Sequence, residues 1–403
     1  MSGAAVGTTE LRARFARSLS ALYGSEVPAY TTLVEVSEAV NADVLAAMGP
    51  EAERLGSVAR VTAERHGAIR VGTPEEIAQV GRIFGACGMF PVGFYDLREA
   101  TPPIPVVSTA FRPIEGAELA ANPFRVFTSM LVVDDRRFFD ARTQSQLEEF
   151  LGSRRLFPDE LLDLADLAEK AGGLSSYDAE RFLELATASF ALSPEPVDRA
   201  WYDHLESISS VAADIGGVAS THINHLTPRV LDIDDLYRRM TALGIEMIDR
   251  IQGPPRTSRP AVLLRQTSFR ALAEPRTFRE PDGTIVRGEL SVRFGEVEAR
   301  GVALTPAGRS LYDARGIDAF PDTEQGLHDA GLAHYRRDDA GLLQPIVYED
   351  FLPTSAAGIF ASNLTSDGSV DAAQRAAARD ATWLQAALGR TLHDPYALYA
   401  AQV

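Results

Sequence analysis

Cysteine is almost absent from this chain, since Cys87 is the single thiol among 403 residues. One cysteine cannot form an internal disulfide, so a disulfide-held fold is excluded, and we expect Cys87 to be a buried structural thiol. Long apolar runs are also missing, because no stretch of about 18 apolar residues exists that could cross a bilayer. The first residues lack the charged start and apolar core of a signal peptide. We therefore expect a cytoplasmic protein without a membrane partner.

Basic residues are scarce relative to acidic ones. The sequence holds 39 Lys and Arg against 56 Asp and Glu, which gives a formal net charge of -17. Such a surface repels phosphate backbones and anionic lipids, which argues against nucleic acid and membranes as partners. A few arginines that converge in one pocket can still bind an anionic small molecule. Because 45% of the residues are hydrophobic, the chain is expected to fold into a globular core.

The first half of the chain predicts helices followed by a mixed module. In residues 8–65, apolar side chains recur at intervals of three and four, which predicts a helical N-terminus. Residues 66–135 then predict a strand at 66–72 and a helix at 73–88, which opens with an N-cap threonine and a first-turn proline. Three β-rich runs separated by turn residues follow. This is the order of a βαβββ module.

A second βαβββ module is predicted over residues 213–305, after a charged, leucine-rich helical insertion at 136–212. Its predicted elements are a strand at 221–226, a helix from Asp232 to Leu243, and strands at 261–269, 283–292 and 294–304. Residues 306–403 predict a mainly helical tail, interrupted by a loop at 344–363 that contains proline and glycine. We therefore predict an α+β fold in which residues 1–403 form one composite catalytic domain.

Histidines open the first strand of each predicted module. His66 begins the strand of the first module, and His222 and His225 lie in that of the second. Two imidazoles and one carboxylate on one face of a metal leave positions open for substrate and O2, which is typical of non-haem Fe(II) enzymes. Residues 222 and 225 are an odd number apart, so only one of them can face the site from a regular strand. Spacing alone does not choose between them, nor between Fe, Zn and Ni.

Glu296 is the leading candidate for the carboxylate ligand. Glu296 and Glu298 share one face of a predicted strand, and a buried carboxylate needs a positive partner, which a metal provides. The alternative is a solvated strand on which both glutamates pair with Arg293 and Arg300. Glu289 is a weaker candidate for the same position.

Arg70 is the candidate for binding an anionic substrate. It lies four residues beyond His66, so in an extended strand its side chain points to the same face, roughly 13 Å further along. A guanidinium there could bind the far carboxylate of a dicarboxylic substrate through two N–H groups, although an arginine on the protein surface would give the same pattern. Other polar groups that could line the pocket or support the ligands are His222, Arg265, Gln266, Thr267 and Ser355.

Several long motifs in order carry a resemblance to a known family. They are ERHGAIRVGT, GFYDL, STAFRP, PFRVFTS, INHLTPR, LLRQTSF, RFGEVEARGVALTPAGRSLYD and FLPTSAAGIFASNL, and they extend over nearly the whole chain. Together they resemble the 2-oxoadipate dioxygenase/decarboxylases, a family that was formerly grouped as a domain of unknown function and that belongs to the vicinal oxygen chelate superfamily. The resemblance implies that paired βαβββ modules form a metal-centred β-barrel.

The resemblance also implies that His66, His225 and Glu296 hold Fe(II). The 4-hydroxyphenylpyruvate dioxygenases support the same choice, because their second histidine stands shortly before an Asp-Ile helix opening, as His225 stands before residues 232–233. Their ligand glutamate lies in a Phe-x-Glu-x-x-x-Arg string, which this chain repeats around Glu296. The choice leaves His222 to make a hydrogen bond behind the ligands or to pack in the core.

The substrate implied by the resemblance is a 2-oxo dicarboxylic acid, 2-oxoadipate. Arg70 matches the family arginine that binds the substrate carboxylate, and Thr354 stands where the family commonly has valine beside the substrate. The implied reaction consumes O2 and yields 2-hydroxyglutarate and CO2, a step of lysine catabolism. The extra hydroxyl of Thr354 leaves the preferred 2-oxo acid open.

Other functions are compatible with the same predicted fold. An isomerase or lyase would use Zn or Ni without O2, and a related dioxygenase would act on a different 2-oxo acid. A binding protein that has lost catalysis is a third alternative, because a fold does not determine function. Metal content and oxygen uptake separate these alternatives. The sequence gives no indication of the oligomeric state.

Overall fold

The structure is a computed structural model that describes residues 5–290, 293–352, 371 and 373–403. The described helices are α1 (Thr8–Glu26), α2 (Pro28–Met48), α3 (Val58–Ala63), α4 (Pro74–Ala86), α5 (Gly116–Ala121), α6 (Ala141–Ser153), α7 (Asp159–Ala171), α8 (Ser176–Ser189), α9 (Arg199–Ile208), α10 (Ser210–Gly217), α11 (Ile233–Ala242), α12 (Pro306–Arg315), α13 (Glu324–Asp329), α15 (Ala381–Leu388) and α16 (Pro395–Ala400). The strands are β1 (Val6–Gly7), β2 (Arg65–Val71), β3 (Phe90–Asp96), β4 (Val106–Arg112), β5 (Arg125–Leu131), β6 (Gly173–Leu174), β7 (Val197–Asp198), β8 (His225–Pro228), β9 (Leu264–Ser268), β10 (Glu274–Arg279), β11 (Ile285–Leu290), β12 (Glu296–Arg300), β13 (Tyr335–Arg337) and β14 (Leu343–Pro345).

The first module forms most of a five-stranded sheet with the order β3-β4-β5-β2-β8. Strand β2 runs parallel to β5, and the other neighbours are antiparallel. Helix α4 follows β2 as predicted, because the Thr73 side chain accepts a hydrogen bond from the Glu76 backbone N–H and Pro74 fills the first turn. The predicted βαβββ order is therefore present, with the short helix α5 added before the last strand.

The second module continues the same sheet from its edge. Its first strand, β8, pairs antiparallel with β2, so that His225 lies opposite Ala68. Its last strand, β12, lies beside β8 in a parallel bridge, in which the Val230 N–H donates to the Glu298 carbonyl at 2.8 Å. Strand β9 pairs antiparallel with β12. The first and last strands therefore run parallel in both modules: β2 and β5 in the first, and β8 and β12 in the second.

Two predictions for the second module are correct only in part. The strand expected at 221–226 begins only at His225, since residues 221–224 are not in a strand. The strand expected at 283–292 is present as β11, but it forms a hairpin with β10, which in turn pairs with β7 of the helical insertion outside the module. Alternating β-branched residues predict a strand without identifying its partner. The described strands form no closed sheet, so the expected barrel is not seen.

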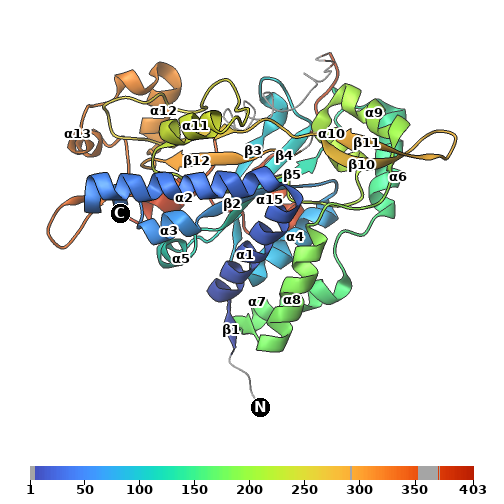
Figure 1. Cartoon of the computed structure of the whole chain (residues 1–403), viewed down its shortest axis with the longest axis horizontal. Coiled ribbons are helices and arrows are strands. Elements are labelled where there is room, and N and C mark those ends of the chain that lie inside the picture. Colours follow the sequence, from blue (N-terminus) through green and yellow to red (C-terminus); the bar gives the residue numbers. More distant parts are fainter. Residues whose placement is uncertain (1–4, 291–292, 353–370, 372) are drawn as a thin grey trace.

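Helices surround the two modules (Figure 1). Helix α2 runs from the left side to the middle of the molecule, where α1 leads towards the N-terminus, and α12 and α13 lie at the opposite end from the β10–β11 hairpin. The predicted insertion is helical, from α6 to α10. The tail contains the β13–β14 hairpin as well as short helices. None of the described helices combines the length and apolar character that crossing a bilayer requires.

Helix α1 fixes the two strands that begin at His225 and Glu296. Its apolar face, which includes Phe15 and Leu19, is fully buried in the main core. The hydroxyl of Tyr23 lies 3.1 Å from the carbonyl oxygen of Asn224 and 2.8 Å from that of Phe294. These two carbonyls precede β8 and β12. One buried hydroxyl thus holds the starts of two strands from different parts of the chain at a fixed separation.

Candidate metal centre

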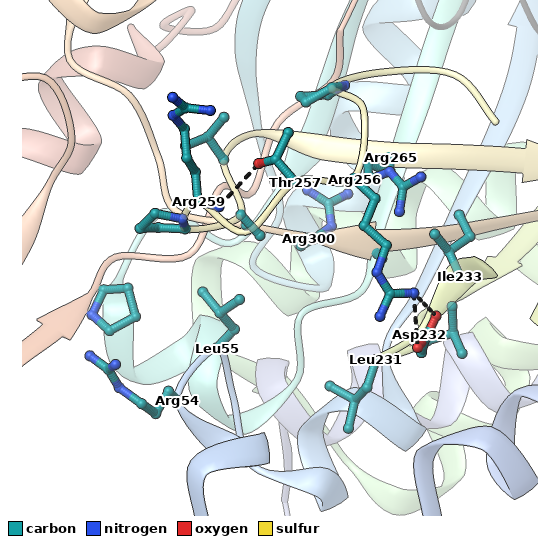
Figure 2. Close-up of a pocket in the computed structure, with 18 of the residues that line it drawn as sticks. Arg54, Leu55, Leu231, Asp232, Ile233, Arg256, Thr257, Arg259, Arg265 and Arg300 are labelled. Atoms are coloured by element: carbon teal, nitrogen blue, oxygen red, sulfur yellow. Dashed lines mark hydrogen bonds and ion pairs between the residues drawn. The ribbon is translucent and has the colours of Figure 1, made fainter. Parts of the chain in front are cut away.

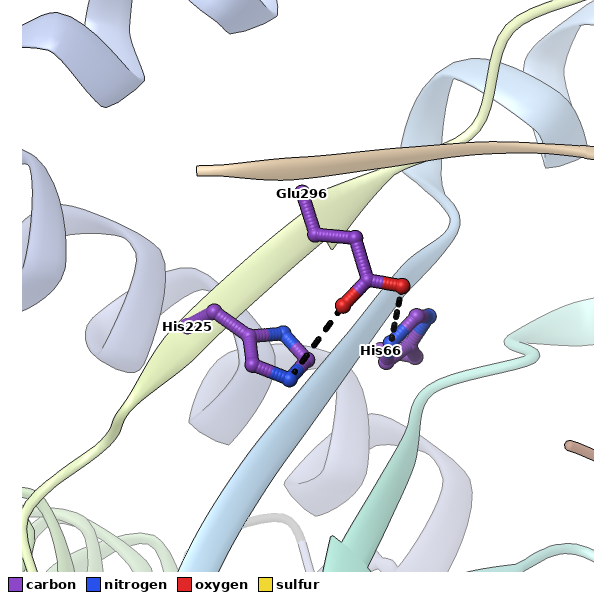
Figure 3. Close-up of side chains that lie close together, drawn as sticks. All are labelled: His66, His225 and Glu296. Atoms are coloured by element: carbon purple, nitrogen blue, oxygen red, sulfur yellow. Dashed lines mark ion pairs between the residues drawn. The ribbon is translucent and has the colours of Figure 1, made fainter. Parts of the chain in front are cut away.

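Three buried side chains converge where the two modules meet. His66 lies in β2, and His225 and Glu296 are the first residues of β8 and β12. Figure 3 shows the carboxylate between the two rings. Its oxygens lie 3.9 Å from His66 Nε2 and 3.4 Å from His225 Nε2, and one donor atom from each side chain lies within 4.8 Å of the others. The structure therefore brings together the three residues that the sequence singles out as ligands.

Contacts on the far side of each ring orient the two imidazoles. His66 Nδ1 lies 2.8 Å from Glu298 Oε2, and His225 Nδ1 lies 3.0 Å from the Thr227 hydroxyl. Each Nε2 is thereby directed towards Glu296. Such partners on the second ring nitrogen are typical of histidines that bind metals, because they fix the tautomer and the ring orientation.

The carboxylate and the rings are also held by their neighbours. Glu296 Oε1 accepts a hydrogen bond from the Gln266 side-chain amide on β9. The ring of His66 meets the ring of Phe351 edge to face at 4.9 Å between centroids, and that of His225 stacks on Phe294 at 5.3 Å. These aromatic contacts restrict rotation of both imidazoles and shield the centre from water.

The electrostatics of the centre favour a bound cation. Burial lowers the pKa of both His66 and His225, so both rings are neutral and their Nε2 lone pairs can bind a metal. Burial, and then the nearby Glu298 charge, raise the pKa of Glu296 well above its usual value. A dication between the three groups would stabilise the ionised carboxylate. Two neutral imidazoles and one carboxylate fit Fe(II), Zn(II) or Ni(II), and leave the choice among these metals open.

A buried network of arginines and carboxylates supports the centre from behind. Burial alone would raise the pKa of Glu298, but Arg300, His66 and Arg125 outweigh it and hold this pKa at about 2. Arg300 Nε lies 2.6 Å from Glu298 Oε1, and Arg125 Nη1 lies 3.3 Å from the same oxygen. Arg125 also pairs with Glu64, at 2.7 Å, and with Glu349. Glu298 is therefore ionised, and its carboxylate lies in close contact with His66 Nδ1.

Substituting Glu298 with glutamine is expected to weaken metal binding by about ten- to a hundredfold, because His66 loses its charged partner while the volume of the side chain is kept. Competition with a chelator for Co(II) or Fe(II) measures this affinity. Glu289→Gln, on the exposed strand β11, is the matched control and should bind metal as the wild type does. Equal affinities for wild type and Glu298→Gln would exclude this positioning role.

Acid is expected to destabilise the fold through Glu349. Burial would raise the pKa of Glu349, but Arg60 and Arg125 outweigh it and the pKa is lowered. A carboxylate with a lowered folded-state pKa stabilises the fold above its unfolded pKa of about 4.5, and this stabilisation is lost as the pH falls through the folded-state value. The free energy of unfolding, measured with urea between pH 7 and pH 3, should depend less steeply on pH for Glu349→Gln than for the control Glu99→Gln. Glu99 is an exposed glutamate that pairs with Arg137. Identical slopes would contradict this assignment.

Arg70 lies on the same sheet face as His66 and is buried. Its guanidinium pairs with Asp214 of α10. The residue opposite Arg70 in the sheet is Ser129, whose hydroxyl lies 2.9 Å from that of Ser108. On this face of the sheet, a row of polar side chains therefore lies beside the metal centre, at the level of Arg70. A carboxylate bound there would share the guanidinium with Asp214.

The structure places the other predicted residues away from the three ligand atoms. His222 Nε2 lies 3.3 Å from Asp214 Oδ1 and 3.2 Å from the Asn224 amide nitrogen, so His222 belongs to the cluster around Arg70. Arg265 pairs with Asp234 at 2.6 Å. Thr267 is buried in β9. The alternative of a solvated strand is not seen, because Glu296 and Glu298 are both buried and Arg293 pairs with Glu274. Thr354 and Ser355 lie outside the described residues.

Sequence reasoning missed Asp214 and the network behind His66. Asp214 is the single acid in the apolar helix α10, and a lone carboxylate in such a run requires a buried partner, which is a usable signal. Burial would raise its pKa, but His222 and Arg70 outweigh it and lower the value. Glu64 directly precedes the Arg65-His66 pair. No sequence pattern links Glu64 with Arg125, because their pairing depends on strand register.

Comparison with known proteins identifies similar chains. A family model described as 2-oxoadipate dioxygenase/decarboxylase matches residues 15–363. Proteins of that name from Mycobacterium bovis and Mycobacterium tuberculosis are each 60% identical, over 98% of this chain and 96% of the relative. One from Pseudomonas putida is 39% identical, over 98% of this chain and 95% of the relative.

Solved structures show the same similarity. The crystal structure of the hydroxyglutarate synthase of Pseudomonas putida in complex with 2-oxoadipate has a TM-score of 0.84 at 35% identity, covering 100% of this chain and 96% of that one. A Shigella flexneri protein has a TM-score of 0.82 at 35% identity, covering 98% and 97%. A glyoxalase superfamily protein from Ralstonia eutropha, with a TM-score of 0.55 at 21% identity, covers 73% and 84% and shares the fold alone.

Proposed function

The chain belongs to the 2-oxoadipate dioxygenase/decarboxylase family, and we propose that it converts 2-oxoadipate and O2 to 2-hydroxyglutarate and CO2 at His66, His225 and Glu296. In this reaction the C1–C2 bond breaks and C1 leaves as CO2. One oxygen atom of O2 enters the new carboxylate at C2, and the other becomes the hydroxyl on C3. The substrate thus supplies all four electrons that reduce O2, and no second reductant is needed.

One observation carries the proposal: two neutral imidazoles and one carboxylate meet within 4.8 Å in a buried site. Ligands about 2.1 Å from an ion and at right angles to each other lie about 3 Å apart, so the observed separations need only a small closure. When bound, Fe(II) would supply the electron transfer that allows O2 to react with a 2-oxo acid, which none of these side chains provides. Three protein ligands on one face leave room for the substrate.

The surrounding residues have separate tasks in this proposal. Glu298 and Thr227 keep the two Nε2 atoms directed at the metal, as their contacts with the Nδ1 atoms indicate. Arg70 binds the distal carboxylate of the substrate and orients the chain so that C2 and C3 face the centre. Phe351 and Phe294 limit the access of water to the reacting atoms.

Oxygen uptake by metal-loaded protein tests the function. Protein loaded anaerobically with Fe(II) is mixed with 2-oxoadipate, 2-oxoglutarate or 2-oxohexanoate, and then with O2. We expect 2-oxoadipate to give equal amounts of consumed O2 and released CO2, with 2-hydroxyglutarate as product. Turnover with Zn(II) or Ni(II) and no oxygen uptake would instead identify an isomerase or lyase.

We further propose that residues 1–403 act as one composite catalytic domain whose paired modules surround the metal as in vicinal oxygen chelate proteins. The support for this is that β2 of the first module and β8 and β12 of the second supply the ligands. The proposal that Thr354 lines the substrate pocket rests on the family resemblance. If Thr354 touches the substrate, Thr354→Val should shift the preference among the three acids above. A cytoplasmic location and a role in lysine catabolism stay predictions.

A further inference from the structure

A second hollow lies apart from the metal centre. It is a cavity of about 400 Å³ between the C-terminal end of α2, the start of α11 and the proline-containing segment 254–262 (Figure 2). None of the three candidate ligands lines it, nor does Arg70. The cavity therefore does not belong to the proposed active site.

Arginine dominates the charged lining of this cavity. Figure 2 shows several of the arginines around the hollow. The lining arginines are Arg54, Arg229, Arg256, Arg259, Arg265 and Arg300, and the lining acids are Glu51, Asp232, Asp234 and Glu324. The arginines exceed the acids by two, although the whole chain carries a net charge of -17. Arg259 also pairs with Asp318 and Asp322, and Arg229 and Arg300 pair with Glu64 behind the wall, so the lining is marked by its many guanidinium donors and not by a large net charge. Guanidinium groups are suited to binding carboxylate and phosphate groups.

The deepest of these arginines have unused donors. Arg229 and Arg300 are 1% and 4% exposed, and Arg229 Nε and Arg300 Nη2 have no hydrogen-bond partner in the part of the chain that the structure describes. Both guanidinium groups contact Glu64, at 2.9 and 3.3 Å, so they lie close together. A buried donor without an acceptor destabilises the protein, and more so when the donor is charged. An acceptor group of a ligand would remove this cost.

The buried ion pairs behind this wall leave one positive charge in excess. Four arginines share three carboxylates there: the set is Arg60, Arg125, Arg229 and Arg300 with Glu64, Glu298 and Glu349. Burying an uncompensated charge is unfavourable unless a counter-ion lies nearby. The cavity is the adjoining space in which an anion could provide that charge.

The remaining lining is largely apolar and includes Val44, Met48, Val230, Leu231, Ile233 and Pro254. We propose that this cavity binds a small organic anion, with its acidic group near Arg229 and Arg300 and its apolar body against these side chains. Arg256, whose side chain is 63% exposed, stands at the solvent side and pairs loosely with Asp232 at 3.2 Å. It is placed to attract an anion into the cavity. The proposal is independent of the catalytic function, because it requires neither metal nor 2-oxo acid.

Fluorescence of 8-anilinonaphthalene-1-sulfonate, an aromatic anion, tests the proposal on the metal-free full chain. We expect saturable binding of one probe per chain, weakened by added NaCl. Arg256→Glu should lower the affinity at least tenfold. The matched control is Arg238→Glu, an arginine that is 75% exposed and pairs with Asp235 outside the cavity. It should bind the probe as the wild type does.

Displacement of the probe identifies the acidic group that the cavity accepts. Glutarate and inorganic phosphate are titrated separately, and the stronger competitor shows whether carboxylate or phosphate is preferred. Arg54→Gln, on the other side of the hollow, gives a second variant with an expected loss of severalfold, and circular dichroism confirms that each variant is folded. Binding that does not saturate, or that is equal in wild type, Arg256→Glu and Arg54→Gln, would overturn the proposal.

Discussion

Replacing His225 with alanine is expected to abolish Fe(II) binding and to lower kcat/KM for 2-oxoadipate by at least about a thousandfold, or about 4 kcal/mol of transition-state stabilisation. The reason is geometric: His225 Nε2 lies 3.4 Å from the Glu296 carboxylate and faces the same space as His66. Losing one of three ligands leaves two donors, too few to keep the ion in place during turnover. Metal content after gel filtration and oxygen uptake measure the two effects.

His222→Ala is the matched control for that experiment. His222 is as buried as His225 and only three residues away, but its ring contacts Asp214 and Asn224 instead of Glu296. We expect this variant to retain its metal and to change activity chiefly through Arg70, the other partner of Asp214. If His222→Ala lost the metal while His225→Ala kept it, the assignment of the ligands would be wrong.

The second large effect is expected at Arg70. Removing its charge should lower kcat/KM for 2-oxoadipate by roughly a hundredfold, or about 3 kcal/mol, because the distal carboxylate of the substrate loses a buried, charged hydrogen-bond donor. The substitution Arg70→Met alone would leave Asp214 buried without its guanidinium. The double variant Arg70→Met/Asp214→Asn removes both charges and separates substrate binding from this structural cost.

A substrate without the distal carboxylate provides the comparison. The acid 2-oxohexanoate has the same chain length as 2-oxoadipate but ends in a methyl group. The double variant should therefore use 2-oxohexanoate about as well as the wild type does, within roughly threefold, while losing activity on 2-oxoadipate. Equal losses on both acids would show that Arg70 acts on the structure of the centre and not on the substrate.

The sequence predicts many local elements and the residues that meet at the candidate centre, for physical reasons that are visible in single residues. Thr73 and Pro74 mark the start of α4 because capping and proline geometry act within one helical turn. Positions 66, 225 and 296 are predicted as ligands because two imidazoles and one carboxylate on one face form a set that binds Fe, Zn or Ni. The family resemblance then chose His225, a choice that strand alternation alone had left open.

Long-range pairing is what the sequence does not reveal. The β10–β11 hairpin has ordinary strand residues, yet its partner is β7, about 80 residues earlier in the chain. The sequence places Glu298 on the same strand face as Glu296, but its contact with His66 follows only from the bridge between β8 and β12. Register and the packing of distant segments decide such contacts, and neither is encoded in local propensity.

The Tyr23 hydroxyl has a consequence for the order of events during biosynthesis. Because it reaches the carbonyl oxygens of Asn224 and Phe294, the hydroxyl on α1 can form these hydrogen bonds only after segments 201 and 271 residues further along the chain have been synthesised. The candidate metal centre can therefore form only after residues 294 and 296 have left the ribosome. Fusion partners or deletions at the front of the gene product would then disturb a centre whose own residues they do not touch.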